Sequence, residues 1–126
     1  MKVIRDREYV NSFHFDMRNF KMEEEHGTPK TQYNVEFHLV EKNEAEQSTT
    51  IILVMHFMNV QEKFVVSGVI SQQVKVTDGI VNEPSDISNE DKHALAQPLF
   101  DMVNRLTYEV TEVTFDAPGI NLGEVR

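Results

Sequence analysis

The run Ile51-Ile52-Leu53-Val54-Met55-His56-Phe57-Met58 lies near the middle of the 126-residue chain and is almost unbroken in apolar residues. A short apolar run of this kind, rich in β-branched residues and bounded by polar turns, is typical of a strand. We therefore expect a strand over Thr49–Met58 with apolar side chains on both faces. The rest of the domain can cover one face, so the other face needs a cover of its own.

Three other segments alternate apolar and polar residues with a period of two, which indicates half-buried strands. They are Tyr9–Met17, Thr31–Glu41 and Lys63–Thr77. Gly68 interrupts the last of them and is expected to mark a bulge or bend. Residues 23–29 carry a glycine and a proline without apolar periodicity, so we expect a solvated loop there. Short connections favour an antiparallel meander, because parallel strands need long crossovers.

A helix is expected after the sheet. Ser88 followed three residues later by Asp91 resembles a capping box at a helix start. The residues that then recur at helical spacing are Leu95, Leu99, Met102, Val103, Leu106 and Val110. Pro98 is expected to kink this helix or to divide it in two, because proline lacks a backbone donor. The β-branched run Tyr108–Phe115 leaves open whether the helix continues or becomes extended chain.

The composition limits what the protein can do. At 126 residues the chain fits a single α+β domain spanning residues 1–126. Its 21 acidic and 12 basic residues give a net charge of -9, which disfavours nucleic acid and anionic membrane surfaces as partners. The absence of cysteine excludes disulfides and thiolate chemistry and suits the cytoplasm. The charged amino terminus does not resemble a signal peptide, and no apolar stretch is long enough to span a membrane.

Candidate chemical sites are few. His14, His38 and His56 share the parity of the polar side of their strands, so they could meet only if those strands were adjacent and in register. No metal-binding spacing accompanies them, and we expect no metal site. Nucleophile elbows and phosphate-binding glycine loops are absent as well. We therefore expect no enzyme and no cofactor, and keep a small-ligand or catalytic role of the three histidines as an alternative.

Apolar residues are the stronger signal. Val65 and Val69 lie on the opposite side of their strand from Phe64, as the two-faced strand 49–58 also requires. Such a surface is either a homo-oligomer interface or a groove for an apolar partner, because monomers rarely expose large apolar patches. From strand parity we expect Met55, Phe57 and Phe64 to contribute to polypeptide binding or to the interface, since thioether and aromatic side chains supply much contact area.

The segments Tyr9–Asp16, Tyr33–Leu39, Ile51–Phe57 and Pro98–Arg105 occur in an order that resembles the SecB-like export-chaperone fold. The chain more closely resembles an uncharacterised family of short acidic bacterial proteins related to that fold. The resemblance covers about residues 9 to 122. It implies a four-stranded antiparallel sheet of order 1-4-3-2, counted along the chain, with the C-terminal helix region on one face. It also implies homodimers or tetramers and no catalysis.

The same resemblance implies grooves that hold unfolded polypeptide, and acidic residues that dock an export motor. Asp16 matches one acidic docking position, but Ser12 and Gly68 stand at the other matching positions, which argues against motor docking. Two hypotheses follow. The protein is a SecB-like module that binds unfolded polypeptide through an apolar groove, or it is an oligomeric structural or interaction domain without chaperone activity.

Overall fold

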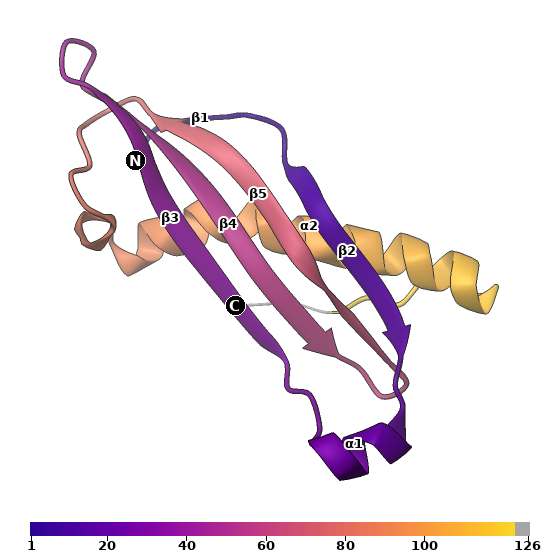
Figure 1. Cartoon of the computed structure of the whole chain (residues 1–126). Coiled ribbons are helices and arrows are strands. Elements are labelled where there is room, and N and C mark those ends of the chain that lie inside the picture. Colours follow the sequence, from indigo (N-terminus) through magenta and orange to yellow (C-terminus); the bar gives the residue numbers. More distant parts are fainter. Residues whose placement is uncertain (123–126) are drawn as a thin grey trace.

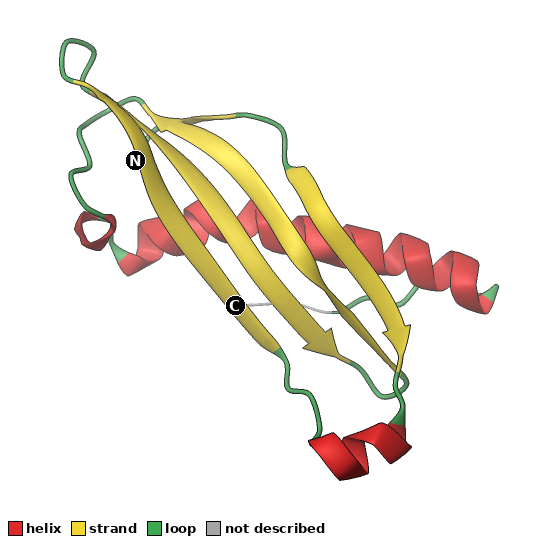
Figure 2. Ribbon diagram, in the orientation of Figure 1, coloured by secondary structure: helices red, strands yellow, loops and turns green. Residues whose placement is uncertain are grey.

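A five-stranded antiparallel sheet carries a long helix on one face in the computed structural model, which describes residues 1–122 (Figures 1 and 2). The elements are β1 (Val3–Arg5), β2 (Tyr9–Met17), α1 (Phe20–His26), β3 (Gln32–Asn43), β4 (Ser48–Val60), β5 (Phe64–Val76), the 3-10 turn η1 (Pro84–Asp86) and α2 (Asn89–Phe115). The expected α+β class, with an antiparallel sheet and a C-terminal helix, is confirmed.

The sheet has the order β1-β5-β4-β3, and β2 also pairs with β5. β1 and β2 share one edge of β5: β1 pairs with residues 74–76 of that strand and β2 with residues 64–71. The prediction of four strands is wrong, because β1 is a fifth strand. Three residues are too few to display a period of two, so β1 left no pattern in the sequence.

The core lies between α2 and one face of the sheet. Odd-numbered residues of β4 and even-numbered residues of β5 point toward α2 and are buried, as Met55 and its register partner Ile70 illustrate. The helix contributes Leu95, Leu99 and Val103 to the same core. Gly68 lies across from Phe13, next to a register shift in β2, and a side chain there would collide with the backbone of Ser12. The expected irregularity at Gly68 therefore lies where β2 passes too close to β5 for a side chain to fit.

Residues 20–26 form helix α1, so the loop expected over residues 23–29 is wrong for its first half. Asn19 caps this helix, because its side-chain Oδ1 accepts a hydrogen bond from the Met22 amide at 3.1 Å. Arg18 holds the first turn from outside through paired hydrogen bonds of 2.6 and 3.1 Å to Glu23. Gly27 follows the last turn with a positive φ of 96°. A capping residue and an ion pair thus specify a helix too short to show apolar periodicity.

Helix α2 begins where the sequence predicts, since the Ser88 hydroxyl accepts a hydrogen bond from the Asp91 amide at 3.1 Å. It then continues for 27 residues and passes through Pro98 without dividing. The β-branched run Tyr108–Phe115 is helical, and Asp116 ends the helix in a left-handed conformation. The uninterrupted helix carries its last turns beyond the β2 edge of the sheet (Figure 1).

Candidate functional site: an aromatic groove at the end of the long helix

Three phenylalanines from different elements meet below the end of α2. The rings of Phe15 on β2 and Phe64 on β5 stack with centroids 5.1 Å apart. Phe115, the last residue of α2, lies with its ring centroid 6.0 Å from each of them. Aromatic pairs at these separations attract one another beyond their area of burial. This cluster joins the end of the helix to the sheet.

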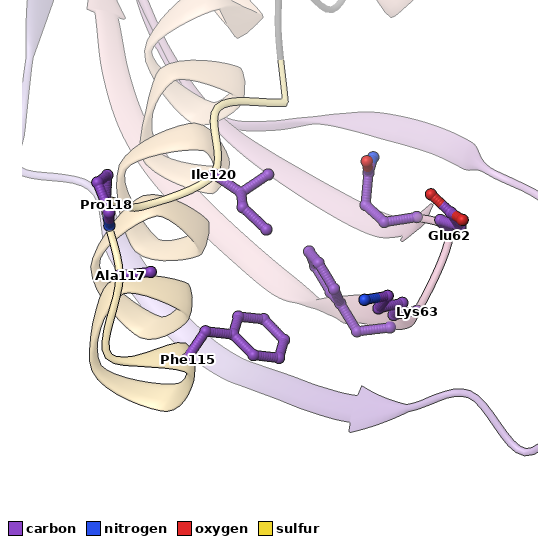
Figure 3. Close-up of a pocket in the computed structure, with 8 residues that line it drawn as sticks. Glu62, Lys63, Phe115, Ala117, Pro118 and Ile120 are labelled. Atoms are coloured by element: carbon purple, nitrogen blue, oxygen red, sulfur yellow. The ribbon is translucent and has the colours of Figure 1, made fainter.

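A cavity of about 490 Å³ opens beside the cluster, and we call it the terminal groove (Figure 3). Its lining residues are Gln61, Glu62, Lys63, Phe64, Phe115, Ala117, Pro118 and Ile120. In Figure 3 the side chains of Phe115 and Ile120 project from the helix end and the C-terminal segment into the space in front of Lys63. A cleft of this size with apolar walls and a few polar groups at its mouth is suited to binding.

Apolar side chains remain exposed around the groove. Phe115 is 38% exposed although it belongs to the aromatic cluster. Met17, the register partner of Phe64, is 56% exposed. Phe20, at the start of α1, is 57% exposed and lies under the guanidinium of Arg18. Neighbouring apolar side chains left in solvent are typical of a surface that another chain covers.

Arg18 fixes the β4–β5 turn, whose residues 61–63 form the other wall of the terminal groove. Its guanidinium donates to the carbonyl of Gln61 at 3.1 Å, and its amide donates to the carbonyl of Lys63 at 2.9 Å. Hydrogen bonds from this guanidinium lower the pKa of the Glu23 carboxyl, so the pair is ionised at neutral pH. The β4–β5 turn is therefore held in place before any ligand arrives.

The residues predicted to bind polypeptide lie in different surroundings. Met55 is 0% and Phe57 4% exposed, and both face α2 in the core. Neither has surface with which to touch a partner. Phe64 is also buried, but it lines the terminal groove. Sequence reasoning missed Phe115 and Ile120; the signal was an aromatic residue just before Asp116–Gly119, where the chain must turn back.

No element within residues 1–122 covers the sheet face away from α2, and we call it the open face. Its aliphatic residues form a stripe along the two central strands: Ile52, Val54, Met58 and Val60 on β4, and Val65 and Val69 on β5. Asp16, the predicted acidic docking position, is exposed on this face opposite Val65. The apolar residues that the sequence places on both sides of strand 49–58 therefore lie partly in the core under α2 and partly on the open face.

The three strand histidines also lie on the open face. Glu36 on β3 contacts two of them, His38 at 2.9 Å and His56 at 3.7 Å. His14 is apart from them, because it lies on β2 and the whole of β5 separates that strand from β4. Among residues 1–122, no group of three or more His, Asp or Glu side chains could hold a metal ion. In that range, too, no helix has the length and apolarity to cross a membrane.

Residues 1–123 match a protein family described as a protein of unknown function (DUF1149). The chain belongs to this family. The match spans nearly the whole chain, so the sheet, both helices and the terminal groove all lie within the region that defines the family. Comparison with curated proteins finds no relative.

Solved structures extend the comparison. The crystal structure of a protein of unknown function from Streptococcus agalactiae is 48% identical, covers 98% of each chain and superposes with a TM-score of 0.94. A SecB-like chaperone from Mycobacterium tuberculosis, solved in complex with an antitoxin peptide, is a distant match. It is 13% identical, with a TM-score of 0.43 over 98% of this chain and 88% of that one. Membership of a family of unknown function is confirmed, and the chaperone likeness is distant.

Proposed function

We propose that the protein binds non-helical segments of unfolded polypeptide in the terminal groove. The observation that carries the proposal is the cluster of Phe15, Phe64 and Phe115 at the wall of an open cavity, with Phe115 still partly exposed. Aromatic side chains offer large contact area at little cost in rotamer freedom. A site built in this way binds apolar residues of many shapes.

The chemistry around the groove favours weak and general recognition. Met17 adds an unbranched thioether, which adapts to varied partners. Glu62 and Lys63 place opposite charges among the lining residues and select for neither sign. Binding should depend little on salt, because burial of apolar area is not screened as surface charge is. The proposal assigns the protein no catalysis and no cofactor, and places it in the cytoplasm.

Two substitutions on the last turn of α2 test the proposal. Phe115→Ala removes a wall of the groove, whereas Val113→Ala removes a side chain that is 83% exposed and is not among the lining residues. We expect the wild type and Val113→Ala to suppress aggregation of a reduced, unfolded test protein, and Phe115→Ala to lose most of that effect. The proposal fails if the wild type suppresses nothing at several-fold excess, or if both variants behave alike.

A second candidate is an oligomeric domain whose apolar surface is purely structural. The aliphatic stripe of the open face favours it, because Val54, Met58 and Val69 are only partly buried on the side that α2 does not cover. A self-complementary stripe of this kind suits a two-fold interface between identical chains. In that case the protein forms homodimers or tetramers, and the intact assembly does not bind unfolded chains.

A further inference from the structure

The C-terminal segment Ala117–Leu122 covers the last turns of α2 and forms one side of the terminal groove. Asp116 turns the chain with φ 48° and ψ 48°, and the segment then runs back beside the last turns of α2. Ala117, Pro118 and Ile120 form one wall of the cavity. Ile120 and Leu122 also pack against the core. This part of the chain therefore makes apolar contacts of the kind that a bound polypeptide would make.

A buried threonine holds the backbone of this segment. The Thr111 hydroxyl accepts a hydrogen bond from the Ile120 amide at 2.9 Å and donates one to the Thr107 carbonyl at 2.7 Å. Thr111 is 0% exposed, so its hydroxyl acts as a fixed acceptor inside an apolar surrounding. One main-chain hydrogen bond between two apolar side-chain contacts is a common way to hold a peptide without reading its full sequence.

Gly119 allows the segment to lie close to the helix. A Cβ atom at this position would collide with the carbonyl oxygen of Tyr108 and would lie 2.7 Å from the ring atom Cδ1 of the same residue. The backbone of the helix cannot give way to remove that contact. A glycine is therefore required immediately before the residue whose amide binds Thr111.

We infer that Ala117–Leu122 is an internal ligand of the α2 surface that Tyr108 and Thr111 form beside the terminal groove, and that this surface selects segments of the same chemistry. The pattern is a glycine, an aliphatic residue, any residue and a second aliphatic residue, as in Gly119-Ile120-Asn121-Leu122. The inference rests on the proposed function. A tethered segment competes at a high effective concentration, so an outside polypeptide has to displace it, and the apparent affinity of that α2 surface is reduced accordingly.

The test uses full-length Gly119→Val, in which the internal segment cannot lie against Tyr108 and leaves the α2 surface. The probe is a fluorescent peptide with the sequence of residues 116–122. We expect this variant to bind the peptide at least tenfold more tightly than the wild type does. The same peptide with valine in place of the glycine should bind neither protein. Gly79→Val is the matched control, because a Cβ at Gly79 meets no atom within 4 Å, and it should behave as the wild type.

A second pair of variants keeps the inference testable if Gly119→Val does not fold. Thr111→Val removes the acceptor of the Ile120 amide, whereas Thr107→Val removes only a hydroxyl that donates to the Val103 carbonyl. Hydrogen exchange at the Ile120 amide should become at least tenfold faster in Thr111→Val and stay unchanged in Thr107→Val. Equal exchange in the two variants overturns the inference, as does equal binding of the glycine and valine peptides to folded Gly119→Val.

The two proposals fail in different ways. If Gly119→Val binds the glycine peptide while no variant suppresses aggregation of unfolded protein, the internal ligand stands and the general polypeptide-binding function is lost. If the wild type suppresses aggregation but Gly119→Val and Thr111→Val do so no better than their controls, the function stands and the segment is only a structural part of the wall.

Discussion

Arg5 donates a hydrogen bond of 2.9 Å to the carbonyl oxygen of Ala94, the acceptor that Pro98 leaves without its helical partner. An amide at position 98 would normally serve that carbonyl, but proline has no N–H. The bond to Ala94 comes from Nη2 of Arg5. Its other terminal nitrogen, Nη1, donates to the carbonyl of Leu95 at 2.9 Å and to the side chain of Gln72 at 3.2 Å. The guanidinium of β1 thus supports α2 at the point where its own ladder is incomplete.

The cost of removing Arg5 should depend on Pro98. Hydrogen bonds to a charged donor contribute about 1.5–3 kcal/mol, so we expect Arg5→Ala to lower the free energy of unfolding by about 2 kcal/mol. In a Pro98→Ala background the restored amide serves the Ala94 carbonyl, and the cost should fall by about 1 kcal/mol. Denaturant unfolding of the four proteins in this cycle measures the difference.

Arg7→Ala is the control for the cycle, since Arg7 is an exposed arginine two residues away. It should change stability by less than about 0.5 kcal/mol in either background. Additive costs for Arg5→Ala and Pro98→Ala would show that the guanidinium does not replace the missing amide.

Low pH should weaken the ion pair between Arg18 and Glu23, which links helix α1 to the β4–β5 turn. Hydrogen bonds from Arg18 lower the pKa of Glu23 in the folded protein. This stabilisation is fully present above the ordinary carboxyl pKa and is lost as the pH falls through the lowered folded value. Glu23→Gln should therefore melt at a lower temperature than the wild type at neutral pH, and the gap should narrow below about pH 4.

Glu24→Gln is the matched control, because the neighbouring Glu24 is exposed. Its melting temperature should follow that of the wild type from neutral to acidic pH. A gap between Glu23→Gln and the wild type that widens on acidification would contradict the lowered pKa.

Two methionines of β4 lie on opposite faces of the sheet. Met55 is 0% exposed and faces α2, whereas Met58 lies on the open face and is only partly buried. We expect Met55→Ala to cost about 2–4 kcal/mol of unfolding free energy because it leaves a cavity. Met58→Ala should cost less than about 1 kcal/mol in the monomer. Equal costs in urea titrations would mean that the open face is packed as tightly as the core.

The open face should control the size of any assembly. We expect the protein to be at least dimeric at micromolar concentration, since an aliphatic stripe on a two-layer domain favours self-association. Val54→Asp places a charge in the middle of that stripe and should shift the mass measured by light scattering toward the monomer. Val113→Asp, on the exposed end of α2, should leave the mass unchanged. A wild type that scatters as a monomer would remove this candidate.

Strands were the easiest part of the fold to predict, because burial of one side imposes a period of two. The expected ranges 49–58 and 63–77 lie within one or two residues of the ends of β4 and β5. The helix start at Ser88 was equally clear, because a capping residue and its partner three residues later form a short sequence pattern. By contrast, β1 and α1 depend on partners distant in sequence or on single side chains such as Arg18 and Asn19, and short elements of this kind carry no period.

The site was harder to predict. Odd and even positions along a strand show which residues share a face of the sheet, but they do not show which element covers that face. Met55 and Phe57 had the right residue types for binding, yet α2 lies over them. Arg5, which is more than 80 residues away in sequence, donates to the Ala94 carbonyl that Pro98 leaves without an amide partner, so no local pattern could reveal this support of α2. Without the continuity of α2 through Pro98, the position of Phe115 beside Phe15 and Phe64 could not be inferred.

The pairing of both N-terminal strands with β5 has a consequence for biosynthesis. β3, β4 and β5 follow one another with short turns, so they can pair as soon as they leave the ribosome. β1 and β2 are made first but must wait for β5, and Arg5 must wait for α2, the last helix to emerge. Until β5 has emerged the first 17 residues have no strand partner, and until α2 has emerged the core face of the nascent sheet is uncovered. The nascent chain therefore carries an exposed apolar sheet face until residues 89–115 fold over it.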